Sequence, residues 1–191
     1  MSVSIENKQI AQLALKAFGG SPKVFKYWDE NNESSIDILS SKDIQLADDI
    51  FSFSTIGLSE FSIGDENNEK PLRVELVGAS DFECFPNILS TCAFNIINSK
   101  FECHPGAIYK DVVNMYMPNS SMKHILFISP FLWADKLKTV NFEKKQVTWL
   151  MIIPISEEEK CYADKFGVDT LEELFEVKQI NVFDLERNSI I

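Results

Sequence analysis

The spacing of apolar residues predicts a helix over residues 5–18. Apolar side chains recur there at i, i+3, i+4 and i+7, which places them on one face of a helix. These residues are Ile10, Leu13, Ala14 and Ala17. Gly19 and Gly20 follow directly, and glycine supplies the left-handed backbone with which many helices end. We therefore expect an amphipathic helix that buries one face.

Four short stretches instead alternate apolar and polar residues, at residues 25–27, 36–38, 51–54 and 72–76. Successive side chains of a strand point to opposite faces of a sheet, so this pattern predicts half-buried strands. The polar side chains that we expect in water are Lys26, Asp37, Ser52, Ser54, Arg73 and Glu75. The polar stretch 64–71 predicts a hairpin-type loop between two of these strands.

The second half of the chain changes period twice. Residues 86–99 carry a broad apolar stripe at helical spacing, which predicts a helix buried on a sheet. Residues 123–132 and 146–155 are nearly continuous apolar runs. Runs this short and rich in isoleucine predict central strands that are covered on both faces.

Two capping boxes predict helix starts near the end of the chain, one from Ser156 with Glu159 and one from Thr170 with Glu173. Residues 180–185 alternate loosely and predict a last strand. No repeat or linker-like stretch interrupts the chain. The pattern as a whole predicts the α+β fold class, with helices packed on a mixed sheet.

Charge is distributed unevenly along the chain. The net charge is −11, and residues 29–69 hold eleven acids and one base. Such a surface disfavours nucleic acid, because duplex binding relies on Lys and Arg contacts to phosphates. It attracts a basic protein and speeds its approach, or it merely keeps the chain in solution.

The residue types that enzymes use are sparse. The two histidines are His104 and His124, and a Cys–His nucleophile pair would need partners that sequence does not identify. Cys103 directly precedes His104, and adjacent side chains point apart in an extended chain. The sequence has no Gly-rich phosphate loop, no nucleophile elbow and no metal-ligand spacing. It therefore predicts a binding protein without a catalytic site, a cofactor or a metal.

The start of the chain and its cysteines indicate a compartment. The first residues lack the basic and apolar regions of a signal peptide. The longest apolar runs are far shorter than the ~20 residues that span a bilayer. Four cysteines without a framework spacing predict free thiols, mostly buried. We expect a cytoplasmic protein that does not contact a membrane.

Seven segments, taken in order, resemble those of the suppressor of fused (SUFU) domain family. They are residues 54–59, 86–89 with 95–99, 104–106, 123–127, 149–159, 171–175 and 182–185. The resemblance covers nearly all of the chain. It implies a single SUFU-like domain over residues 1–191, with a mixed, mostly antiparallel sheet packed with helices.

Within this family the chain is most similar to a small bacterial branch of immunity proteins. The resemblance implies an antitoxin that binds and neutralises a cognate LXG-type secreted toxin, with a nuclease as the expected toxin. The alternative is a cytoplasmic SUFU-like adaptor that sequesters a peptide or a regulatory protein. Neither role requires catalysis, and the free protein is expected to be a monomer or a weak dimer.

A nuclease presents a basic face to DNA, so its inhibitor needs a complementary acidic one. The acidic segment is the candidate for that face. The residues that we predict to contact the partner are Asp29, Glu30, Asp43, Asp48, Asp49, Asp65 and Glu66.

Overall fold

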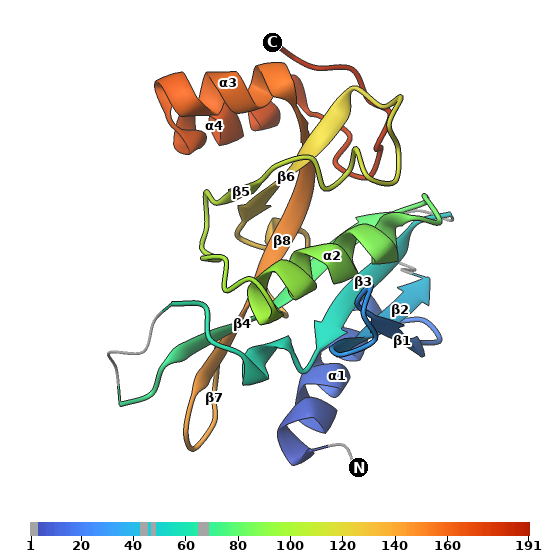
Figure 1. Cartoon of the computed structure of the whole chain (residues 1–191), viewed down its shortest axis with the longest axis vertical. Helices are drawn as coiled ribbons and strands as arrows, with labels where there is room; N and C mark the ends of the chain where they lie inside the picture. The colour runs from blue at the N-terminus through green and yellow to red at the C-terminus, as the bar shows by residue number, and fades with distance from the viewer. Residues whose placement is uncertain (1–3, 43–45, 47–48, 65–68) are drawn as a thin grey trace.

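The computed structural model describes residues 4–42, 46, 49–64 and 69–191 (Figure 1). The helices are α1 (Ile5–Phe18), α2 (Phe85–Ile97), α3 (Glu157–Phe166) and α4 (Val168–Lys178), with short 3-10 turns η1 (Leu58–Glu60) and η2 (Phe131–Trp133). The strands are β1 (Lys23–Trp28), β2 (Ser35–Lys42), β3 (Phe51–Ile56), β4 (Leu72–Ser80), β5 (Ile108–Tyr109), β6 (Met122–Ile128), β7 (Val140–Asn141) and β8 (Gln146–Ser156). Every helix and strand that the sequence predicts between residue 5 and residue 155 is therefore present.

The strands form one mixed sheet in the order β1-β2-β3-β4-β8-β6-β5, and β7 adds to β8. Only the pairing of β4 with β8 is parallel, so the sheet is mostly antiparallel, as predicted. The two apolar runs become β6 and β8, which lie side by side. Along β8, every residue from Trp149 to Ser156 is buried. This agrees with the prediction of central strands covered on both faces.

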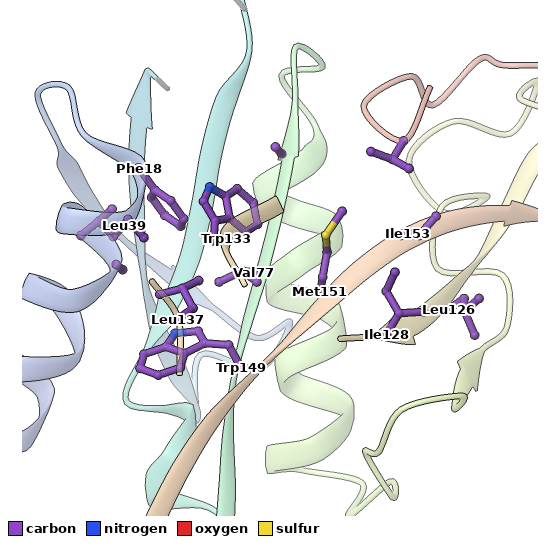
Figure 2. Packing of buried hydrophobic residues seen from close by; sticks show 14 of the residues in the cluster. Phe18, Leu39, Val77, Leu126, Ile128, Trp133, Leu137, Trp149, Met151 and Ile153 are labelled. Carbon is purple, nitrogen blue, oxygen red and sulfur yellow. The ribbon is translucent and has the colours of Figure 1, made fainter. Parts of the chain in front are cut away.

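Helices cover both faces of this sheet (Figure 1). One core combines α1, α3 and α4 with residues of β8 and with the η2 segment. Figure 2 shows part of it, where Phe18 lies beside Trp133 and Leu137 lies over Trp149. The rings of Phe18 and Trp133 have centroids 4.9 Å apart. The second core lies beneath α2, whose predicted apolar stripe is fully buried.

The coverage of both faces corrects the prediction of half-buried strands. Ser52, Ser54 and Glu75 were expected in water, and all three are buried. Period-two alternation indicates one apolar face, but it does not exclude a second cover made by α1 or α2. The buried polar groups are paired instead, since Ser54 Oγ donates to the Thr55 carbonyl oxygen.

Glu75 organises the turn between β3 and β4. Its Oε1 accepts from the backbone N–H groups of Gly57 and Ser59, each at 3.0 Å. Its Oε2 accepts from Leu58 N–H at 3.2 Å and from the Thr55 hydroxyl at 2.6 Å. Burial raises the pKa of Glu75, and these hydrogen bonds offset part of that effect. This carboxyl group holds the segment 54–59 in place.

One of the two predicted capping boxes is present. The Ser156 hydroxyl accepts from Glu159 N–H, and the Glu159 carboxylate accepts from Ser156 N–H, each at 3.1 Å. The second prediction is wrong, because α4 begins at Val168, after Gly167. The Thr170 hydroxyl instead donates to the Phe166 carbonyl oxygen, one turn back. Gly167 has φ 92°, a conformation that lets the chain turn directly from α3 into α4.

The strand predicted at residues 180–185 is also absent, and the tail forms turns instead. Its carbonyl groups bond to side chains rather than to a strand: Ser80 Oγ donates to Phe183 O, and Ser120 Oγ donates to Leu185 O. The four cysteines are free, as predicted. Cys92 and Cys103 are buried, Cys84 is half-buried, and Cys161 is exposed.

Candidate protein-binding surface

Strand β1 exposes apolar side chains on both of its faces. It stands at one end of the strand order and pairs with β2. Val24, Phe25 and Trp28 are 53%, 50% and 53% exposed. Alternation had predicted that Phe25 would be buried, and this prediction is wrong. An apolar edge strand of this kind normally marks a place where another chain docks or pairs.

The helices leave Val24, Phe25 and Trp28 largely exposed because they pack mainly on the inner strands. Helix α1 contacts β2 and β3, and α2 contacts β2, β3 and β4. Phe25 pairs with Ile38, which belongs to the core under α2. Val24 pairs with Leu39, which belongs to the core under α1. Apolar side chains of β1 therefore extend both cores outward, beyond the helices that cover them.

An aromatic cleft lies between β1, β3 and the start of α2. It has a volume of about 320 Å³, and its aromatic lining comes from Phe25, Tyr27, Phe51, Phe53 and Phe82. Phe51 is 41% exposed, and its ring centroid lies 6.5 Å from that of Phe53. Exposed aromatic groups around a cleft provide the anchoring sites on which protein interfaces depend. We call the cleft together with Val24, Phe25 and Trp28 the β1 surface.

Two acidic residues, Asp81 and Glu83, also line the aromatic cleft. Asp81 directly follows Ser80, which pairs with Phe51, and Asp49 comes two residues before Phe51. These three acids therefore lie at the same end of the sheet. All are exposed. The lysines Lys23 and Lys42 lie at this end too, so its charge is mixed.

The structure separates the sequence-predicted acids. Asp29 and Glu30 lie in the turn between β1 and β2, whereas Asp49 lies beyond the far end of β2. Strand β2 has eight residues, and at about 3.3 Å per residue it spans about 25 Å. Asp43, Asp48, Asp65 and Glu66 lie outside the described residues. Asp29 and Glu30 therefore do not share one face with Asp49, which lies at the same end of the sheet as Asp81.

Asp29 has a structural role in the β1–β2 turn. Its Oδ1 accepts from Glu33 N–H at 2.8 Å, and its Oδ2 accepts from the Asn98 side-chain amide at 3.0 Å. Desolvation opposes ionisation of Asp29, but hydrogen bonds from the turn backbone and from Asn98 outweigh it and lower the pKa. Asp29 thus joins the turn to the end of α2. Glu30, its neighbour, is exposed.

Asp81 and Glu83 were missed because sequence reasoning followed net charge. They lie outside the segment 29–69 that carries the charge excess. A local signal was present, since two acids flank Phe82 at the junction of a predicted strand and a predicted helix. Phe82 is half-buried against the core under α2, and the exposed acids on either side of it reach the cleft.

The histidines and cysteines form no nucleophilic pair. Cys103 is buried while His104 is exposed, so the adjacent side chains point apart as predicted. His124 is buried, and its Nδ1 accepts from Asp111 N–H at 2.9 Å. Its Nε2 donates to Glu157 Oε2 at 2.8 Å, which fixes the tautomer.

Glu157 also accepts a hydrogen bond from Cys161 Sγ, at 3.5 Å from Oε1. This contact raises the pKa of the Cys161 thiol, which is the opposite of what a nucleophile needs. Among the described residues, no group of three or more His, Cys, Asp or Glu side chains is placed to hold a metal ion. No helix in the described part of the chain is long and apolar enough to cross a bilayer.

Comparisons with known proteins agree on one family. The family model "Suppressor of fused protein (SUFU)" matches residues 32–188. "Immunity protein YqcF" of Bacillus subtilis (strain 168) is 54% identical over 193 residues, and the match covers all of both chains. This relative is similar along the whole sequence, including the stretch that forms β1.

Solved structures share the fold at low sequence identity. A putative SUFU homologue from Neisseria gonorrhoeae has a TM-score of 0.75 at 18% identity, covering 98% of each chain. A chain of the Sufu–Fu complex has a TM-score of 0.68 at 13% identity, covering 95% of this chain and 91% of that one. Drosophila Suppressor of Fused has a TM-score of 0.58 at 12% identity, and 96% of this chain matches 50% of it.

Proposed function

The chain belongs to the suppressor of fused protein (SUFU) family, and we propose that it is an immunity protein, which neutralises a toxin by binding it. The observation that carries this proposal is the 54% identity to Immunity protein YqcF over the full length of both chains. The local chemistry supports a role in binding without catalysis. His124 and Cys161 each bond to Glu157, an arrangement that holds a helix start and activates no nucleophile.

The β1 surface is the proposed contact with the toxin. It combines exposed apolar side chains with a cleft, and it lies at a sheet end where another chain can approach. Asp81 and Glu83 line the cleft, and Asp49 lies at the same end of the sheet, so these acids can pair with Lys or Arg of the toxin at the rim. The aromatic groups then supply most of the affinity, while the acids chiefly raise the association rate.

The proposed partner is an LXG-type secreted toxin with a nuclease domain. The net charge of −11 supports a basic partner, because a nuclease must present cationic groups to phosphates. We place the encounter in the cytoplasm, with one SUFU-like domain over residues 1–191 that is a monomer or a weak dimer when free. Direct contact with nucleic acid or a membrane forms no part of this role.

The free edge of β1 also favours a second function, that of an adaptor which sequesters a peptide or regulatory protein. An extended peptide could pair with β1 and place side chains in the aromatic cleft. This mode would depend on backbone hydrogen bonds along β1. It predicts tight binding to a short extended peptide, whereas immunity predicts binding to a folded toxin domain.

The test is a titration of the full chain with the C-terminal domain of the nearest-encoded LXG-type toxin. The immunity role predicts a stable one-to-one complex and loss of nuclease activity. Trp28→Ser should weaken the complex at least ~10-fold, because anchoring aromatic residues carry 2 kcal/mol or more at interfaces. The control Phe101→Ser, at a residue 48% exposed and outside the β1 surface, should bind as the wild type does.

Two further outcomes separate the ideas. Binding that neither variant weakens would keep the immunity role and overturn the β1 surface. No binding to the toxin domain, together with capture of a short extended peptide, would favour the adaptor. Thermal melting of each variant confirms that the comparison is made between folded proteins.

A further inference from the structure

A second groove lies far from β1, on the face of the sheet that α1, α3 and α4 cover. It has a volume of about 610 Å³ and lies between α4, the end of β6 and the tail after α4. Its apolar lining comes from Ile128, Phe131, Ile153, Phe175, Ile180 and Val182. Figure 2 shows Ile128 and Ile153 on neighbouring strands, and Phe131 is 52% exposed. We call this site the α4 groove.

One wall of the α4 groove is acidic. Four carboxylate side chains line it: Asp169, Glu172, Glu173 and Glu176. Their spacing along α4 is i, i+3, i+4 and i+7, which places them on one side of the helix. Within the part of the chain that the structure describes, no Lys or Arg forms an ion pair or hydrogen bond with any of the four. The wall therefore carries uncompensated negative charge beside apolar groups.

We infer that the α4 groove binds a basic amphipathic helix of a partner protein. An apolar side chain of that helix would enter the groove between Phe131 and Phe175, and flanking Lys or Arg side chains would meet the four carboxylates. Charge complementarity selects this occupant, because a neutral apolar segment would leave the acidic wall unpaired. The inference does not depend on the immunity role, since the groove and the β1 surface lie at different ends of the sheet.

The dimensions fit a helix. Asp169 and Glu176 are seven residues apart on α4, and at 1.5 Å per residue the acidic wall extends over about 10 Å. Two turns of a partner helix have the same length, so residues at i and i+7 would meet opposite ends of the wall. Helix binding in an apolar groove relies on such i, i+3, i+4 and i+7 anchors. A single metal ion is a poor occupant, because no three of the described carboxylates are placed to share one.

The probe is a peptide of about 14 residues, about four helical turns, made only of Lys and Leu with Leu at i, i+3, i+4 and i+7. Two matched peptides separate the contributions, one with every Leu replaced by Ser and one with every Lys replaced by Glu. Each is titrated into the full chain at low and high salt and followed by amide NMR shifts. We expect only the Lys–Leu peptide to bind, with shifts at α4, Phe131 and residues 180–182, and with weaker binding at high salt.

Variants test whether the groove itself is responsible. Glu172→Gln with Glu176→Gln should weaken binding of the Lys–Leu peptide about 10-fold, the expected effect of losing two partly desolvated charge pairs. The control Glu102→Gln with Glu143→Gln removes the same charge from exposed sites elsewhere and should have no effect. Phe131→Ser should also weaken binding, whereas Phe101→Ser should not.

Three results would overturn the inference. The first is equal loss of affinity in the double variant and its control, which would mean that net charge alone attracts the peptide. The second is equal binding of the Lys–Leu and Lys–Ser peptides, which would remove the apolar groove from the interaction. The third is a set of NMR shifts confined to the β1 surface. None of these results bears on toxin binding, which is measured separately.

Discussion

The Thr55 hydroxyl, which belongs to β3, links the carboxyl group of Glu75 on β4 to the backbone N–H of the next residue, Leu76. Thr55 Oγ1 donates to Glu75 Oε2 at 2.6 Å and accepts from Leu76 N–H at 2.8 Å. Both residues are buried. One hydroxyl thus satisfies an acceptor and a donor that water cannot reach, and it fixes the carboxyl group that caps the turn at residues 57–59.

Replacing Thr55 by Val should therefore destabilise the fold at nearly constant volume. The change leaves Leu76 N–H without its partner and removes one donor from Glu75, and each buried polar group left unpaired costs about 1–3 kcal/mol. Urea unfolding should show a loss of about 2 kcal/mol or more. The control Thr139→Val, at an exposed threonine, should change the stability by less than about 0.5 kcal/mol. A similar small effect at Thr55 would contradict the role assigned to its hydroxyl.

Sequence periodicity was sufficient to predict the elements but insufficient to predict what covers them. Residues 5–18 and the stripe in α2 repeat at helical spacing, because one face of each helix packs on the sheet. Alternation in β3 and β4 was equally clear, yet Ser52, Ser54 and Glu75 are buried. Local pattern does not encode a second layer contributed by distant segments.

The binding surface was harder to predict for a related reason. Phe25 and Tyr27 alternate with Lys26 in this edge strand as they would in a core strand. Only the strand order shows that β1 is at an end. Net charge favoured the whole segment 29–69, but strand β2 separates Asp29 and Glu30 from Asp49. The two acids that flank Phe82 were visible in the sequence, but the pairing of β3 with β4 that brings Asp81 and Glu83 to the cleft is not specified by neighbouring residues.

The Glu159–Arg187 pair should be among the costliest contacts to break. Arg187 donates to both carboxylate oxygens of Glu159, at 2.6 and 2.7 Å, and both side chains are buried. Arg187→Met would leave Glu159 buried without its cation, and losing one partner of a buried ion pair costs about 3–5 kcal/mol. Chemical unfolding should show a loss of this size.

The comparison variant for this pair is Lys26→Met. Lys26 and Asp37 form an ion pair at 2.6 Å between partly exposed side chains. Exposed pairs contribute about 0–1 kcal/mol, so this variant should unfold almost as the wild type does. Equal losses in the two variants would contradict the importance given to burial.

The Asp29 contacts predict a loss of stability in acid. The pKa of Asp29 is lower in the folded protein than its ordinary value of 3.8. The stabilisation is therefore fully present above that ordinary value, and it is lost as the pH falls from about 4 through the folded-state pKa. The measurement is urea unfolding of the wild type and Asp29→Asn at several pH values. The difference in unfolding free energy between the wild type and Asp29→Asn should disappear in acid. A difference that does not change with pH would contradict the stabilising role of the Asp29 carboxylate.

Acids at the rim of the aromatic cleft should control how fast the toxin binds. Asp81→Asn combined with Glu83→Gln removes two charges that line the cleft. Electrostatic steering weakens with the charge and with salt, so the association rate should fall several-fold at low salt and little at high salt. Stopped-flow mixing with the toxin domain measures this rate. Glu102→Gln with Glu143→Gln is the matched control, and an equal effect there would assign steering to net charge alone.

The acidic wall of the α4 groove should lower the stability of the protein when no partner helix is bound in the groove. Burial, and then the nearby charge of Asp169, raise the pKa of Glu172 in the folded state. A raised carboxyl pKa means that stability is greatest in acid and falls as the pH rises from the ordinary value of 4.5 through the folded-state pKa. Like charges one helical turn apart cost about 0.2–0.5 kcal/mol per pair, and solvent screening at this partly exposed site keeps the total effect of Glu172 within that range.

Glu172→Gln should therefore raise the unfolding free energy by about 0.2–0.5 kcal/mol at pH 7 and by nothing below about pH 4. Thermal melting at the two pH values measures this difference, with Glu143→Gln as a control at an exposed residue outside α4. A destabilised Glu172→Gln protein would mean that the carboxylate has a structural partner. If Glu172→Gln is more stable than the wild type but binds the Lys–Leu peptide more weakly, the Glu172 carboxylate destabilises the free protein and stabilises its complex with the peptide.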